Sequence, residues 1–181
     1  MKKIYQVFLL FFLCIIFVSC GKSLNSYTIT FVTNGGNSTP NITFNENELP
    51  KLPTNIIREG YTFDEWFFDQ ALTDPYETTE LPNENFTLYA NWILVSYNID
   101  YSLDGGINHS ENPETYTIID QITFNSPSKE GFSFDGWYDN ESFDGTPITQ
   151  IQSGSIGHIS LYAKWNETQL YSISYYGADG T

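Results

Sequence analysis

Cysteine is nearly absent from this chain of 181 residues. The two cysteines, Cys14 and Cys20, lie near the N-terminus, and none follows residue 20. This distribution excludes a disulfide framework and a thiolate metal site from the rest of the chain. The folded part must therefore be stabilised by packing alone. The length allows one large domain or two small ones.

Basic residues are also scarce. Seven lysine and arginine residues stand against 22 aspartate and glutamate residues, which gives a formal net charge of −15. Lys2 and Lys3 precede residue 20 and every acidic residue follows it, so the remaining chain has five basic residues against 22 acidic ones. Such a surface repels the phosphates of nucleic acids. We therefore predict no nucleic-acid partner.

Histidine is equally rare. His109 and His158 are the two histidines, and neither has a His or Cys partner for a metal site. Their non-equivalent places in the chain argue against a Ser-His-Asp triad. The acidic segment 135–144 could gather oxygens round Ca²⁺, but its spacing does not match an EF-hand loop, and a solvated loop is the simpler interpretation. We predict no catalytic residue, no bound metal and no cofactor.

Long apolar runs are missing too. The run Val7–Val18 has twelve residues, whereas a membrane-spanning helix needs about 17–25. It follows a basic start, Met1–Lys3, and precedes small residues, which is the pattern of a secretory signal peptide. Residues 1–19 are therefore predicted to be a signal peptide.

The end of this run, Phe17-Val-Ser-Cys-Gly21, resembles a bacterial lipoprotein signal, in which a small residue precedes the cysteine that becomes the new N-terminus. The resemblance implies that Cys20 carries lipid. It also implies a protein anchored on the outer face of the membrane, in the bacterial cell envelope. Cleavage without lipidation and a retained anchor are the alternatives. Residues 20–26 are expected to form a tether.

What the sequence does contain is internal repetition. The segment Tyr27–Phe31 returns as Tyr97–Tyr101 and again as Tyr171–Tyr175. Each segment alternates apolar with polar residues, as a half-buried strand does. An Asn-Gly or Asp-Gly turn sequence follows each one. The chain therefore contains successive copies of one unit.

The units are expected to be mainly β, because no segment shows a helical period of ten or more residues. We predict two tandem units, residues 27–93 and 97–166, and the start of an incomplete third unit at 171–181. A lone strand cannot bury its own face. The third segment is therefore expected to be disordered or to lie against the second unit.

Two aromatic motifs mark both units. Gly60–Phe67 returns as Gly131–Tyr138, and Leu88–Trp92 returns as Leu161–Trp165. This combination resembles the internalin B-type repeat, also called the Listeria–Bacteroides repeat. The resemblance implies small α+β, β-grasp-like units in a bacterial surface protein. In that family the repeats serve as linkers, stalks or adhesive modules, and no catalytic residues carry over.

Residues that recur between the units are interpreted as a structural core, with sugar stacking on the tryptophans as the alternative. This set comprises Gly60, Tyr61, Phe63, Trp66, Trp92, Gly131, Phe132, Phe134, Trp137 and Trp165. Aromatic residues on the opposite strand face are predicted to point outward and to contact a surface glycan or a host protein. These candidates are Phe67, Tyr89, Tyr138 and Tyr162.

The predicted function is that of a non-catalytic cell-surface lipoprotein whose repeats act as a stalk or adhesion module. One alternative is a carbohydrate- or host-protein-binding surface protein. Another is a truncated fragment of a larger surface repeat protein.

Overall fold

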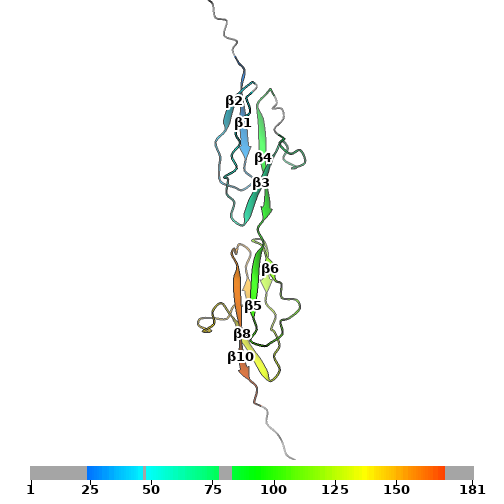
Figure 1. Cartoon of the computed structure of the whole chain (residues 1–181), viewed down its shortest axis with the longest axis vertical. Helices are drawn as coiled ribbons and strands as arrows, with labels where there is room; N and C mark the ends of the chain where they lie inside the picture. Colours follow the sequence, from blue (N-terminus) through cyan, green and yellow to red (C-terminus); the bar gives the residue numbers. More distant parts are fainter. Residues whose placement is uncertain (1–23, 47, 78–82, 170–181) are drawn as a thin grey trace, which may run out of the picture.

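The computed structural model describes residues 24–46, 48–77 and 83–169. They form two units, arranged one after the other along the long axis of the molecule (Figure 1). The predicted signal peptide, Cys20, most of the tether and the third unit at 171–181 lie outside the described residues. Within the described ranges, no helix is long and apolar enough to cross a membrane.

Unit 1 is a four-stranded sheet with the strand order β2-β1-β4-β3. Its strands are β1 (Ser26–Val32), β2 (Ile42–Asn45), β3 (Tyr61–Phe67) and β4 (Phe86–Leu94). The two central strands, β1 and β4, run parallel, and each outer strand runs antiparallel to its neighbour.

Unit 2 repeats this sheet with the order β6-β5-β10-β8. Its strands are β5 (Tyr97–Ser102), β6 (Thr115–Tyr116), β8 (Phe132–Tyr138) and β10 (Ile159–Glu167). The central strands β5 and β10 are again parallel. Two short strands, β7 (Ile122–Thr123) and β9 (Gln150–Ile151), add a separate antiparallel pair.

The central parallel pair determines how the chain passes through each unit. Because the first and last strands of a unit point the same way, the chain enters at one end of the sheet and leaves at the other. A hairpin arrangement would return the chain to its starting end. Copies joined in tandem must therefore extend along the strand direction, as the two units do in Figure 1.

The expectation of a mainly β fold is confirmed, but the expectation of small α+β units is wrong, since the described residues contain no helix. Parallel strands need a crossover connection, which is usually a helix. In unit 1 much of this crossover is the segment between β2 and β3, which contains Pro50 and Pro53. Proline interrupts a helix, and the segment instead contributes the buried side chain of Ile56.

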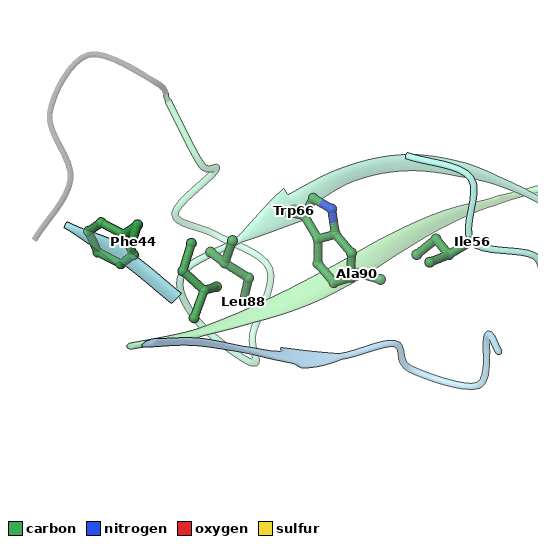
Figure 2. Packing of buried hydrophobic residues seen from close by; sticks show 6 residues of the cluster. Phe44, Ile56, Trp66, Leu88 and Ala90 are labelled. Atoms are coloured by element: carbon green, nitrogen blue, oxygen red, sulfur yellow. The ribbon is translucent and has the colours of Figure 1, made fainter. Parts of the chain in front are cut away.

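Each unit has its own hydrophobic core. In unit 1 the buried residues are Ile29, Phe44, Ile56, Trp66, Leu88 and Ala90. Figure 2 shows members of this cluster spread along the length of β4. In unit 2 they are Ile99, Tyr116, Trp137, Ile151, Leu161 and Ala163. Five of the six positions correspond between the units, whereas Ile56 comes from a connection and Ile151 from β9.

The last strand of each unit is fastened to the turn after the first strand. The indole N–H of Trp92 donates to the carbonyl oxygen of Thr33 at 2.8 Å, and that of Trp165 donates to Leu103 at 3.0 Å. The predicted Asn-Gly turn is present in unit 1, with positive φ at Asn34 and Gly35. The recurrence of both tryptophans therefore has a structural cause in each unit.

Candidate ligand-contact surface

The four aromatic residues predicted to contact a ligand form two cross-strand pairs. Phe67 on β3 is opposite Tyr89 on β4, and Tyr138 on β8 is opposite Tyr162 on β10. Successive side chains of a strand point to opposite faces. Since Leu88 belongs to the core of unit 1, Tyr89 lies on the other face of the sheet. The structure thus brings the candidates together within each unit.

Two of these four residues do not point outward as predicted. Phe67 and Tyr138 are buried, with 7% and 6% of their surface exposed. The loop after each strand folds back over them. Phe67 forms a β-bridge with Pro75, and the Tyr138 ring lies 5.6 Å from that of Phe143. The polarity of these loops gave no indication in the sequence that they would cover an aromatic residue.

Asp69 and Asn140 fix the shape of these covering loops. The Asp69 carboxylate accepts hydrogen bonds from the backbone N–H groups of Thr73, at 2.9 Å, and Asp74, at 2.8 Å. The bond from Asp74 is the main cause of the lowered pKa of Asp69, because it stabilises the ionised carboxylate. In unit 2 the side-chain oxygen of Asn140 accepts from the N–H of Asp144 at 3.0 Å.

The acidic loop of unit 2, residues 135–144, contains the side-chain oxygens that could gather round Ca²⁺. The oxygen of Asn140 that would serve as a ligand is occupied by the backbone of its own loop. Across the described residues, no group of three or more His, Cys, Asp or Glu side chains is placed to hold a metal ion. The structure therefore explains Asn140 as a residue that stabilises the fold of this loop.

Tyr89 and Tyr162 are the half-buried members of the candidate set. Beside Tyr162, the ammonium of Lys164 lies 3.1 Å from the Asp135 carboxylate and 5.1 Å from the ring centre of Tyr138. The hydrogen bond to Asp135 is the main cause of the raised pKa of Lys164. The candidate surface in unit 2 therefore combines an accessible tyrosine with a charged pair.

Unit 1 lacks the positive charge of this surface. Asn91 occupies the place of Lys164 and donates from its amide nitrogen to the Asp64 carboxylate at 3.0 Å. The sequence does indicate this difference, since a lysine, one of five basic residues after residue 20, stands at position 164 where unit 1 has Asn91. The two units thus share a framework but differ in surface charge.

A polar groove of about 660 Å³ runs beside β5 in unit 2. It is lined by Asn98, Ile99, Asp100, Tyr101, Asn108, His109, Ser110, Asn112, Glu114 and Thr115. Two of its side chains already serve the fold. The Tyr101 hydroxyl donates to the Pro113 carbonyl at 2.9 Å, and burial raises its pKa to about 12. The buried Asn112 exchanges hydrogen bonds with the backbone of Asn125.

The groove was not predicted from the sequence. It arises because the segment 108–115 folds back beside a strand ten or so residues earlier in the chain. The residues that line it do not form a compact sequence motif. Of those on β5, Ile99 matches Ile29 of unit 1, whereas Asn98, Asp100 and Tyr101 replace Thr28, Thr30 and Phe31.

The residues interpreted as a structural core lie in the two cores, against the cores, or where β3 and β8 begin. Trp66 and Trp137 are buried in the cores, so their rings are not available for sugar stacking. Phe63, Trp92, Phe134 and Trp165 pack against the same cores.

The remaining recurring residues lie where β3 and β8 begin, with a glycine in the tight turn and an aromatic residue at the start of the strand. Tyr61 and Phe132 are half-buried, each beneath a basic side chain. Arg58 lies 3.7 Å from the ring centre of Tyr61. Gly60 and Gly131 occupy these turns with φ of 75° and 79°, a conformation that favours glycine.

Comparison with known proteins identifies these units. The sequence profile of the Listeria-Bacteroides repeat domain matches residues 27–91 and 97–164. The chain belongs to this family. The resemblance predicted from the two aromatic motifs is therefore confirmed, and each match covers one of the two structural units, or Listeria-Bacteroides repeats.

Several longer proteins contain related repeats. Internalin H of Listeria monocytogenes is 30% identical over 146 residues, which cover 78% of this chain and 25% of that protein. A candidate membrane protein of Evansella cellulosilytica is 33% identical over 156 residues, covering 84% of this chain and 23% of its own length. A Gly-rich candidate membrane protein of the same organism is 32% identical over 136 residues, covering 71% and 16%. The chain thus spans a quarter or less of these relatives.

Proposed function

We propose that this chain is a non-catalytic stalk or adhesion module of the bacterial cell envelope. The observation that carries the proposal is the parallel central pair, which makes the chain enter and leave each repeat at opposite ends. In unit 1, Ile29 of β1 lies opposite Phe86, the first residue of β4. The chain therefore advances along the strand direction by the three residues of β1 that precede Ile29 and by the nine residues of β4. At about 3.3 Å per residue, one repeat advances the chain by ~40 Å.

The relatives support a location in the cell envelope. Two of them are named as candidate membrane proteins, and the third is named as an internalin. The net charge of −15 also suits a projection that stays soluble and does not adhere to anionic surfaces. Extension by repeated cores requires no reaction chemistry.

The proposed attachment to the membrane is a lipid on Cys20. In the bacterium, Cys20→Ala should abolish the acyl mass on the mature protein and move the protein from the membrane fraction to the soluble fraction. Mass spectrometry and fractionation measure both effects. Cys14→Ala is the matched control, because Cys14 lies within the predicted signal peptide and should leave both unchanged. An unchanged membrane fraction for Cys20→Ala would refute the lipid anchor.

A second candidate function is recognition of a glycan or host protein by Tyr162 and its charged neighbours. Tyr162 is half-buried, so part of its ring is accessible, and Lys164 and Asp135 beside it provide hydrogen-bond donors and acceptors. In a screen of soluble glycans and host-matrix proteins, Tyr162→Ala should weaken any binding about tenfold, whereas Ser160→Ala on the same strand should not. Intrinsic tryptophan fluorescence that stays constant up to millimolar glycan, with no matrix protein retained, would exclude this function.

A further inference from the structure

One contact joins the two repeats directly. Gly60, in the turn before β3, is buried. Strand β3 begins at the end of unit 1 that faces unit 2 (Figure 1). A methyl group on Gly60 would lie 2.6 Å from Cβ of Ile118 and 2.7 Å from both Cγ2 and Cδ1 of that residue. The side chain of Ile118, from unit 2, therefore rests directly on the backbone of Gly60.

Unit 2 holds Ile118 in a fixed position. The Asp120 carboxylate accepts hydrogen bonds from the backbone N–H of Thr117, at 2.7 Å, and from its hydroxyl, at 2.8 Å. The carbonyl oxygen of Ile118 accepts from the N–H of Gly154 at 2.7 Å. Hydrogen bonds within unit 2 therefore hold the turn that presents Ile118.

The linker between the repeats bonds to the same glycine. Strand β4 ends at Leu94 and β5 begins at Tyr97, which leaves two residues between them. The N–H of Val95, the first of these, donates to the carbonyl oxygen of Gly60 at 3.0 Å. Gly60 therefore receives a side chain from unit 2 on one side and fixes the linker on another.

The rest of the chain provides an internal comparison. Gly131 is the counterpart of Gly60 in unit 2, and the N–H of Thr168 donates to its carbonyl oxygen at 2.9 Å, as Val95 does to Gly60. Gly131 is exposed, however, and no atom of the described residues lies within 4 Å of a methyl group placed on it. Glu46, two residues after Phe44, takes the place in unit 1 that Ile118 takes after Tyr116.

We propose that the Gly60 face is a docking surface for the Thr117–Asp120 turn of the following repeat, and that Ile118 seated on it fixes the angle between the repeats. A two-residue linker alone leaves several backbone dihedrals free. The contact and the Val95 hydrogen bond remove this freedom, so the pair behaves as one rod. Such a rod forms whether or not the chain carries lipid.

The test measures the distance between the repeats in the full chain in detergent. Spin labels are placed at Thr30→Cys and Ser160→Cys, both exposed, in a Cys14→Ser, Cys20→Ser background. Pulsed electron–electron double resonance should give one narrow distance distribution. Ile118→Glu, which copies the residue of unit 1, should broaden it at least about twofold. Ile119→Glu, at the adjacent position that is 59% exposed, should leave it unchanged.

A second pair of variants separates the contact from backbone strain. Gly60→Ala and Gly131→Ala impose the same positive φ on alanine, but only the former places a methyl group against Ile118. Gly60→Ala should broaden or shift the distribution and Gly131→Ala should not, with near-ultraviolet circular dichroism confirming that both repeats stay folded. A broad distribution in the parent chain, or no response to both Ile118→Glu and Gly60→Ala, would overturn the proposal.

Discussion

Replacement of Leu161 by alanine is expected to lower the free energy of unfolding of unit 2 by about 2–5 kcal/mol. Leu161 has 0% exposure, and its strand β10 pairs with both β5 and β8. The truncated side chain leaves a cavity whose walls are held by paired strands, so the site cannot collapse to fill it. Urea unfolding followed by tryptophan fluorescence measures the change.

Two variants make this test specific. Ile156→Ala removes an aliphatic side chain that is 47% exposed in the same unit, and should cost about 1 kcal/mol or less. Leu88→Ala removes the equivalent leucine from the separate core of unit 1 and should destabilise that unit instead. If Leu161→Ala and Ile156→Ala cost the same, the assignment of Leu161 to the centre of a core is wrong.

Gly106→Ala is expected to destabilise unit 2 by about 1–3 kcal/mol and to displace the ring of Trp165. A methyl group on Gly106 would lie 2.6 Å from Cζ2 of Trp165 and 3.0 Å from the carbonyl oxygen of Ser128. The indole cannot swing away freely, because its N–H donates to Leu103. The NMR resonance of the Trp165 indole N–H should therefore shift, together with the loss of stability.

Gly105→Ala is the matched control for this prediction. Gly105 has φ of 81°, so alanine there costs about 1–2 kcal/mol through backbone strain. No atom of the described residues lies within 4 Å of its added methyl group, so the Trp165 resonance should stay in place. An unmoved Trp165 resonance in Gly106→Ala would show that the glycine is not required by the indole.

The parts of the fold that could be predicted from sequence are those where a local pattern has a direct physical cause. The alternation in Tyr27–Phe31 and Tyr97–Tyr101 became β1 and β5, because one face of each strand is buried. Trp66 and Trp137 recur because each fills the core of its own unit. The Asn34-Gly35 turn could be predicted because asparagine and glycine tolerate the positive φ that both residues adopt.

The parts that could not be predicted depend on segments that fold back over the sheet. Phe67 and Tyr138 have the strand positions of outward-facing residues, but loops stabilised by Asp69 and Asn140 cover them. The alternation of apolar and polar residues predicts a strand, but it carries no information about which loops will fold over that strand. The same reason explains the groove beside β5, which needs a loop and a strand together.

The contact of Gly60 with Ile118 could not be predicted from the sequence for a different reason. The recurrence of Gly60 as Gly131 predicts a requirement of the repeated core, and the positive φ of both glycines is a local requirement of the turn. Only Gly60, however, has Ile118 packed on it among the described residues. A contact between successive copies cannot be inferred by comparing the copies, because the partner residue differs between them, as Ile118 and Glu46 do.

The central claim is that tandem repeats extend the chain, and small-angle X-ray scattering tests it most directly. For the chain from Gly21 onward, two repeats of ~40 Å each should behave as a rod about 80 Å long, with a radius of gyration of about 24 Å. A compact globule of the same chain would instead have a radius of gyration near 15 Å. A value near 24 Å supports a stalk, and a value near 15 Å would contradict it.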